Sequence, residues 1–274
     1  MDLNTITEVT RPQARGEWGA WRAGDAYLGG GTWLFSEPQP RLRRLIDLPT
    51  LGWTPLQVTG DGLEVAATCT IAQLDALAPP VEWVAAPLVN QCCRAFLASF
   101  KIWNTATVGG NICLSLPAGP MISLTAALDG VATLWGADGS ERRVEVTDFV
   151  TGPQRNVLRP GELMHSTWLP AAALTRRATF RQISLTAFGR SGALVIGTLA
   201  QDGAFALTVT AATPRPIKLA FNALPSPETL RRRVDADIPP HAYYDDIHGL
   251  PAWRRHMTQH FAQEIRDELA DAAS

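Results

Sequence analysis

Two glycine-rich turns contain the residues of this chain that are best suited to chemistry. The first reads Gly29-Gly30-Gly31-Thr32 and the second reads Thr107-Val108-Gly109-Gly110-Asn111. Glycine permits a positive φ angle and allows another group to approach the main chain closely. Successive amides in such turns can point inward and form a concavity for an anion. We therefore expect the two turns to grip the two halves of a pyrophosphate, and we expect the ligand to be a dinucleotide.

The composition is that of a globular protein with an apolar core. The chain has 274 residues, of which 46% are hydrophobic and 18% are charged, and its formal net charge is −2. This length predicts two or three compact units. The charge balance offers no basic field for nucleic acid, and no uncharged apolar window reaches the length of a membrane span. Because residues 1–11 lack an apolar signal region, we expect a cytoplasmic protein.

The cysteine and histidine residues do not predict a metal centre. The four cysteines are Cys69, Cys92, Cys93 and Cys113. Their spacing matches none of the usual iron–sulfur runs, so we interpret them as reduced, mostly buried thiols. His256 and His260 have the i, i+4 spacing of a helical metal site, but no third ligand is evident.

Alternating strands and helices must position the two turns. Hydrophobic periodicity and turn residues mark both kinds of element. The expected strands are residues 3–9, 26–28, 45–48, 56–58, 63–66, 131–135, 142–146 and 162–169. The expected helices are residues 12–23, 70–77, 81–99 and 121–128. A hairpin is expected at Gly60-Asp61-Gly62, and Thr70 is expected to cap its helix.

The pattern of predicted elements changes after Arg176 and Arg177, from mixed strands and helices to consecutive strands. Residues 178–183, 193–199 and 204–211 predict three strands of an antiparallel meander. Pro214 and Pro216 are expected to end this meander. Helices are expected at residues 227–234 and 251–270.

Several common nucleotide and hydrolase motifs are missing. The sequence has no G-x-G-x-x-G of a Rossmann site, no G-x-x-x-x-G-K-[ST] of a P-loop and no G-x-S-x-G of a serine hydrolase. Arg190-Ser191-Gly192 contains a serine to which no partner histidine can be assigned.

The remaining motifs, taken in chain order, form a pattern that covers nearly the whole chain. They are Gly-Gly-Thr at 30–32, Ala67-Thr68-x-Thr70, Ile102-x-Asn104-x-Ala106 leading into the second turn, Pro117-Ala118-Gly119, Pro160-Gly161-Glu162-Leu163, Leu169-Pro170, Ala212-Thr213-Pro214-x-Pro216 and Trp253-Arg254-Arg255. This order resembles the FAD-binding medium subunit of the molybdenum hydroxylases, the group of xanthine dehydrogenase and aerobic carbon monoxide dehydrogenase. The second turn is the more specific motif of the two.

The resemblance implies an α+β protein with a PCMH-type FAD-binding fold. Two α/β sub-domains would hold FAD between them, and a small C-terminal domain with a three-stranded antiparallel sheet and helices would follow. We place the boundaries at residues 1–54, 55–174 and 175–274.

The same resemblance implies an oxidoreductase subunit that works in a complex. Its partners would be a large molybdopterin subunit and a small subunit with [2Fe–2S] clusters, arranged as a dimer of heterotrimers. Electrons would pass from the clusters through FAD to an external acceptor. No catalytic residue is expected on this chain, because the redox chemistry belongs to the cofactor.

The cofactor-binding residues are also carried over from the resemblance. Gly29, Gly30, Gly31 and Thr32 would contact the pyrophosphate from one side, and Thr107, Gly109, Gly110 and Asn111 would contact it and the ribityl chain from the other. Trp33, Ser115 and Leu163 complete the expected set.

Four positions depart from the family pattern. Trp33 and Pro120 stand where relatives often have aspartate, Trp103 stands where they usually have arginine, and Gln182 is nearest to a common lysine. One of the two tryptophans could stack on the flavin. Alternatively, bulky side chains could fill the cofactor space, and the chain would then be a scaffold subunit that has lost FAD. A self-contained flavin oxidase is a third hypothesis, but the C-terminal part is small for the cap domain of such an enzyme.

Overall fold

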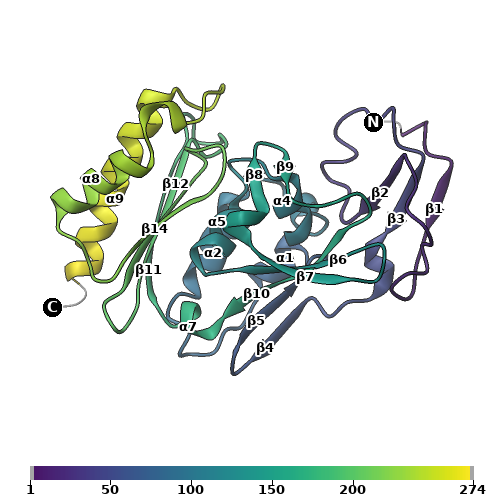
Figure 1. The fold of residues 1–274 in the computed structure, drawn as a ribbon, viewed down its shortest axis with the longest axis horizontal. Helices are drawn as coiled ribbons and strands as arrows, with labels where there is room; N and C mark the ends of the chain where they lie inside the picture. Colours follow the sequence, from purple (N-terminus) through teal and green to yellow (C-terminus); the bar gives the residue numbers. More distant parts are fainter. Residues whose placement is uncertain (1–2, 272–274) are drawn as a thin grey trace.

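Three groups of strands and helices follow one another along the longest axis of the molecule (Figure 1). The computed structural model describes residues 3–271. The N-terminal strands lie at one end, the C-terminal helices lie at the other, and the largest sheet lies between them. The mixture of helix and antiparallel sheet agrees with the α+β class expected from the sequence.

The first group is a small parallel sheet. It consists of β1 (Glu8–Thr10), β2 (Asp25–Leu28) and β3 (Arg44–Asp47), with β3 in the centre. Its core is Trp18 with Ile46, Leu48 and Leu163. The helix predicted at 12–23 is wrong, because this segment forms turns in which two glycines have positive φ. The first strand is also shorter and later than predicted.

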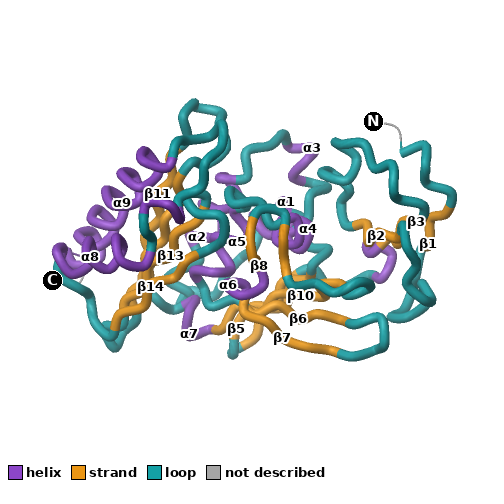
Figure 2. Tube along the Cα trace, turned by 45° about the horizontal axis from the view of Figure 1, so that its top comes forward, coloured by secondary structure: helices purple, strands orange, loops and turns teal. Residues whose placement is uncertain are grey.

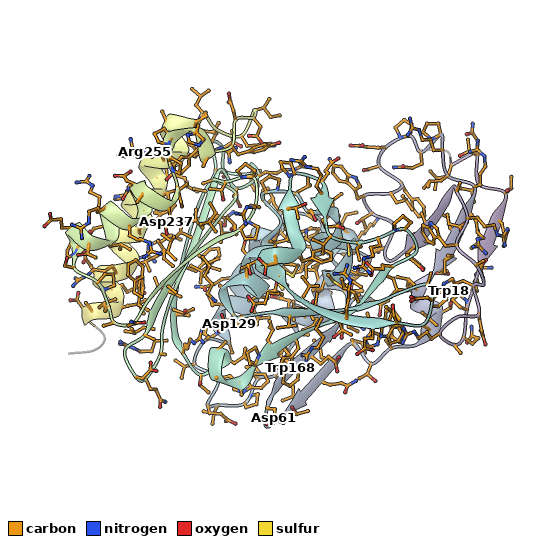
Figure 3. All side chains as sticks on the ribbon, in the orientation of Figure 1. Trp18, Asp61, Asp129, Trp168, Asp237 and Arg255 are labelled. Carbon is orange, nitrogen blue, oxygen red and sulfur yellow. The ribbon has the colours of Figure 1, made fainter. Side chains whose placement is uncertain are left out.

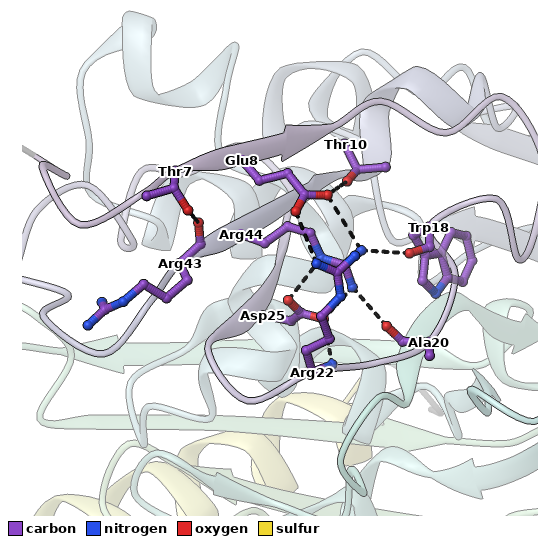
Figure 4. Close-up of polar contacts among 9 residues, drawn as sticks. All are labelled: Thr7, Glu8, Thr10, Trp18, Ala20, Arg22, Asp25, Arg43 and Arg44. Carbon is purple, nitrogen blue, oxygen red and sulfur yellow. Dashed lines mark hydrogen bonds and ion pairs between the residues drawn. The ribbon is translucent and has the colours of Figure 1, made fainter.

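A buried ion pair holds the strands of this sheet together (Figure 4). Arg44 Nε donates to Asp25 Oδ1 at 2.9 Å, and both side chains are almost fully buried. The Arg44 guanidinium also donates to the main-chain oxygens of Trp18 at 2.8 Å and Ala20 at 3.0 Å. Its hydrogen bond lowers the pKa of the Asp25 carboxyl, and the same bond raises the pKa of Arg44. The pair therefore fixes β2, the strand that leads into the first glycine turn.

The second group is built on a five-stranded antiparallel sheet of order β4-β5-β10-β6-β7. Its strands are β4 (Leu56–Thr59), β5 (Gly62–Ala66), β6 (Val131–Trp135), β7 (Glu141–Glu145) and β10 (Leu163–Pro170). A two-stranded ribbon, β8 (Val150–Gly152) with β9 (Arg155–Asn156), stands apart from it. The predicted hairpin β4–β5 is confirmed, and β6 and β7 form a second antiparallel pair.

Most helices of this group lie on one side of the sheet (Figure 2). The helices of the group are α1 (Ile71–Asp75), α2 (Pro87–Ala95), α3 (Phe100–Trp103), α4 (Val108–Leu114), α5 (Pro120–Ala127), α6 (Val146–Phe149) and α7 (Ala171–Leu174). The predicted cap is confirmed, because Thr70 and Gln73 form a capping box at the start of α1. The long helix predicted at 81–99 is wrong: α2 begins only at Pro87, and Val81 is 98% exposed. Proline is favoured at such a first helical position.

The third group contains four strands rather than the predicted three. They are β11 (Arg177–Ile183), β12 (Ala193–Leu199), β13 (Phe205–Thr210) and β14 (Ile217–Phe221), paired in chain order. Pro216 was expected to end the sheet, but it stands just before the edge strand β14, where proline costs no ladder hydrogen bond. The helices α8 (Pro227–Asp237) and α9 (Pro251–Asp271) pack on one face.

Strand β12 is covered on both faces. Every residue of β12 is buried. Val195 belongs to the core under α8 and α9, whereas Leu194 and Ile196 belong to the core of the middle group. Asp129 also joins the two groups by ion pairs to Arg176 and Lys218 at their boundary (Figure 3). These contacts hold the C-terminal sheet against α2 and α5.

The boundaries expected at residues 54/55 and 174/175 remain a proposal. They fall in the links between β3 and β4 and between α7 and β11. Among the described residues 3–271, no helix is both long enough and apolar enough to cross a membrane.

Candidate cofactor site

A cavity of about 640 Å³ lies where the three groups of elements meet. Its volume falls in the range of ligand pockets, which is about 300–1,000 Å³. The turn after β2, the loop before α3, the start of α4 and the segment before α5 all contribute to its walls. Most of the lining side chains are apolar or small.

The two glycine turns meet at this cavity. A Cβ atom placed on Gly29 would lie 2.9 Å from Thr107 Oγ1. A Cβ placed on Gly30 would lie 1.6 Å from the main-chain oxygen of Thr105, which no real side chain could tolerate. The turns therefore touch, as the pyrophosphate hypothesis requires, and only glycine allows the approach at position 30.

The Thr107 side chain contacts both turns. Its side chain is the N-cap of α4, and its Oγ1 accepts a hydrogen bond from the Gly110 amide at 3.1 Å. The residue is only 4% exposed. A Cβ on Gly110 would come within 2.8 Å of the same hydroxyl oxygen. One buried threonine thus fixes the spacing between the first turn and α4.

The amides of the second turn are already bonded within the protein. The Val108 amide donates to the Cys69 oxygen at 2.8 Å, and the Gly109 amide donates to the Ala67 oxygen at 3.0 Å. The Gly110 and Asn111 amides both donate to Thr107, the first to its side chain and the second to its main chain. Residues 108–111 consequently offer no spare amide hydrogen to a phosphate.

The first turn is different. Among the residues that the structure describes, the amides of Gly30, Gly31, Thr32 and Trp33 have no hydrogen-bond partner. All four residues are partly exposed and line the cavity. Unpaired main-chain amides that face a cavity are suitable donors for an anion. The first turn therefore has a run of unpaired amides beside the cavity, and the contact of both turns with a pyrophosphate stays a prediction.

Asn111 and Pro120 form the wall opposite the first turn. Asn111 Oδ1 accepts a hydrogen bond from the Met121 amide at 3.1 Å and so contacts the N-terminal end of α5. Pro120 is the first residue of that helix, where its missing amide costs nothing. The departure at position 120 is thus compatible with an intact wall.

The two tryptophans close to the turns have different places. Trp33 lines the cavity. Trp103 is not among the lining residues, and its Nε1 donates to the Phe96 oxygen at 3.0 Å. Neither indole fills the cavity. The scaffold hypothesis requires bulky side chains to block this space, but the space is open.

Three expected contact residues do not line the cavity. Gly109 packs against Ala67, where a Cβ would come within 2.4 Å of the Ala67 side chain. Ser115 is fully buried and donates to the Ile112 oxygen at 3.0 Å. Leu163 belongs to the core of the first group. A direct contact of these three with a cofactor stays a prediction.

The sequence did not reveal the contributions of Tyr27, Arg190 and Ser191 to the lining. Tyr27 donates its hydroxyl to the Gly161 oxygen at 2.8 Å, and burial raises its pKa to about 12. Arg190 and Ser191 come from the loop between β11 and β12, far along the chain. The Arg190-Ser191-Gly192 run was visible, but no local signal connected it to the glycine turns.

The expectation of buried thiols agrees with the structure. Three of the cysteines are buried and Cys113 is partly buried, and all four are free. Burial raises the pKa of Cys69 to about 12, so this thiol stays protonated. Within the described part of the chain, no group of three or more His, Cys, Asp or Glu side chains could hold a metal ion.

Comparison with known families gives one match that covers more than half of the chain. The family described as "FAD binding domain in molybdopterin dehydrogenase" matches residues 17–172. This range includes both glycine turns and most of the cavity wall.

Curated relatives match a shorter stretch. The xanthine dehydrogenase of Oryza sativa subsp. japonica is 28% identical over 121 residues, which are 42% of this chain and 9% of that protein. Xanthine dehydrogenase 1 of Arabidopsis thaliana is 26% identical over 121 residues, with the same shares of both chains. The chain therefore spans about a tenth of the length of these relatives.

Solved structures match the fold over the full length. Quinoline 2-oxidoreductase from Pseudomonas putida 86 superposes with a TM-score of 0.80 at 18% identity and covers 100% of this chain and 99% of that chain. Reconstituted CO dehydrogenase from Oligotropha carboxidovorans superposes with a TM-score of 0.80 at 19% identity and covers 97% and 98%. These likenesses extend the shared fold through the C-terminal sheet and helices.

Proposed function

The chain belongs to the family of FAD-binding domains in molybdopterin dehydrogenases, and from this premise we propose that it is an electron-transfer subunit of a molybdenum-containing hydroxylase or dehydrogenase. Its partners are a large molybdopterin subunit and a small [2Fe–2S] subunit. Electrons pass from the clusters through FAD to an external acceptor. The complex is a dimer of heterotrimers in the cytoplasm, where the four free thiols would remain reduced.

One observation carries the cofactor assignment: the amides of residues 30–33 are unpaired, and these residues line a cavity that is also lined by residues of the second glycine turn. The site fits a dinucleotide because a phosphate accepts several amide hydrogen bonds at once. A Cβ at Gly30 would overlap the Thr105 oxygen and displace this run of amides.

Residues of this chain bind and orient the cofactor. The amides of the first turn would hold the diphosphate, and Thr107 keeps that turn against α4. Apolar lining residues such as Phe96, Leu97 and Leu116 would offer an apolar surface to the ring system of the cofactor. When bound, FAD supplies the redox chemistry, and the protein supplies position and local dipoles.

Flavin content tests the proposal. The chain, purified alone and together with its partner subunits, should show flavin absorbance and release about one FAD per chain on heating. The complex should contain molybdenum and iron, and the substrate should reduce the flavin only when the partners are present. Absence of flavin from both preparations, or absence of molybdenum and iron from the complex, would contradict the proposal.

The flavin content also distinguishes the proposed electron-transfer subunit from a scaffold subunit. A subunit that kept the architecture but lost FAD would still assemble with molybdenum and iron partners and would contain no flavin. The open cavity of about 640 Å³ supports the FAD-binding form, because Trp33 lies on the wall and Trp103 is turned into the core.

A further inference from the structure

Arg190 is the only charged side chain among the described residues that line the cavity. The other lining residues are glycines, small polar residues and apolar residues. The diphosphate of FAD carries two negative charges. Neutral amides can orient these charges but cannot balance them, so the position of the single cation is informative.

Arg190 lies next to the donor turn. Its guanidinium carbon is 5.9 Å from the centre of the Trp33 ring, within the range of a cation–π contact. Trp33 belongs to the run of unpaired amides. The contact therefore brings a cation from the C-terminal group to the turn that offers the anion-binding amides.

The main chain that follows Arg190 is firmly held. Ser191 is 3% exposed, and its Oγ accepts a hydrogen bond from Gln182 Nε2 at 2.8 Å. The Gly192 amide donates to the Ile183 oxygen at 2.8 Å. The Gly192 oxygen accepts from Arg254 Nη1 at 2.7 Å, and Arg254 is 1% exposed. Although the Arg190 side chain is exposed, the main chain that carries it is therefore fixed beside the cavity.

We propose that Arg190 is the counter-ion of the cofactor diphosphate and that Trp33 holds its guanidinium over the donor turn. This inference rests on the proposed FAD site and adds to it a residue outside the matched range 17–172. It explains why tryptophan is useful at position 33: an indole face orients a guanidinium without competing for the phosphate. The C-terminal group then completes the cofactor site.

Binding of FAD and riboflavin to the full-length apoprotein tests this role. Arg190→Gln should weaken FAD binding by about tenfold, as expected for loss of a charge-assisted hydrogen bond at a solvent-facing site. Riboflavin has no phosphate, so its affinity should change less than twofold. Added salt should weaken FAD binding less in this variant than in the wild type. Arg190→Lys should retain most of the salt dependence because it keeps the charge.

Arg232→Gln is the matched control, because Arg232 is an exposed arginine on α8 and does not line the cavity. It should leave both affinities unchanged. Trp33→Leu should weaken FAD binding, and the double variant with Arg190→Gln should lose less than the sum of the two single losses. Trp33→Phe keeps an aromatic face and should lose less FAD affinity than Trp33→Leu.

The outcomes distinguish the two hypotheses. If the wild type binds FAD but Arg190→Gln binds it equally well, or if riboflavin and FAD lose the same affinity, the counter-ion role is overturned and the proposed function stands. If the wild type binds neither flavin, the proposed function fails and the inference fails with it.

Discussion

The two glycine turns look alike in the sequence, but their main-chain amides differ in the structure. In the turn at 29–33, four amides are unpaired and face the cavity. In the turn at 107–111, the amides of residues 108–111 are bonded to carbonyl oxygens or to the Thr107 hydroxyl. Glycine allows close packing in both turns, and only the first turn has a run of unpaired amides beside the cavity.

This difference shows what a glycine motif alone can predict. Close approach of another group is the shared requirement, but that group can be a ligand or another part of the chain. Gly30 excludes a side chain because the Thr105 main chain lies against it. Gly109 excludes a side chain because Ala67 packs on it. Variants of each turn should therefore fail in different ways.

The largest effect is expected from the ion pair that supports the first turn. Asp25→Asn leaves Arg44 buried without its carboxylate, which should cost about 3–5 kcal/mol of unfolding free energy. Urea unfolding of the apoprotein measures this cost. Asp61→Asn is the control, because Asp61 is exposed at the tip of the β4–β5 hairpin (Figure 3).

The same pair predicts a pH dependence. Arg44 lowers the pKa of Asp25 in the folded state, so the pair contributes stability that is complete above the unfolded pKa and is lost as pH falls through the folded value. The wild type should thus lose stability below about pH 4, where an unfolded aspartate takes up its proton. Asp25→Asn should lack this component. Parallel curves for the two proteins would show that the pair does not titrate as described.

Gly30→Ala should have the next largest effect, and it should act on the ligand. The new Cβ would overlap the Thr105 oxygen and force the two turns apart, at a cost near the upper end of about 1–3 kcal/mol for overpacking. The affinity for FAD should fall on the order of a hundredfold. Gly60→Ala is the matched control, since a Cβ there meets open space. Calorimetric titration with FAD gives the affinities of the two variants. Equal affinities of Gly30→Ala and Gly60→Ala would refute an essential approach at Gly30.

Gly109→Ala should instead act on stability. Its Cβ would press on Ala67, and overpacking of this kind should cost about 2 kcal/mol of unfolding free energy. The folded fraction should still bind about one FAD per chain. Denaturant unfolding together with flavin content of the folded protein checks both parts. A variant of wild-type stability that cannot bind FAD would reverse the roles of the two turns.

Thr107→Ala should have the smallest effect. Loss of the N-cap of α4 should cost about 1 kcal/mol of unfolding free energy. Thr107→Ser keeps the capping oxygen and should recover most of that loss. Urea midpoints of the two variants compare them directly, and an equal loss in both would mean that the methyl group, not the cap, is the stabilising part.

Local signals in the sequence predicted local structure well. The cap at Thr70 and the hairpin at Asp61 depend only on nearby residues, and both are confirmed. The start of α2 at Pro87 and the edge strand after Pro216 were missed, because tertiary packing decides whether a chain near proline continues.

The site was predictable in part for the same reason. The glycine turns could be found from the sequence, and the structure brings them together. Which turn has free amides could not be predicted, because the oxygens of Ala67 and Cys69 that occupy the second turn come from a distant loop. Arg190 reaches the cavity only through the pairing of β11 with β12.

Amide hydrogen exchange with and without FAD tests the central claim most directly. Peptides that cover residues 29–34 should exchange fast in the apoprotein and become protected when FAD binds, because their amides gain an acceptor. Peptides that cover 108–111 should be protected already and change little. Protection gained at 108–111 without a change at 29–34 would contradict the assignment of the first turn as the donor of the cofactor site.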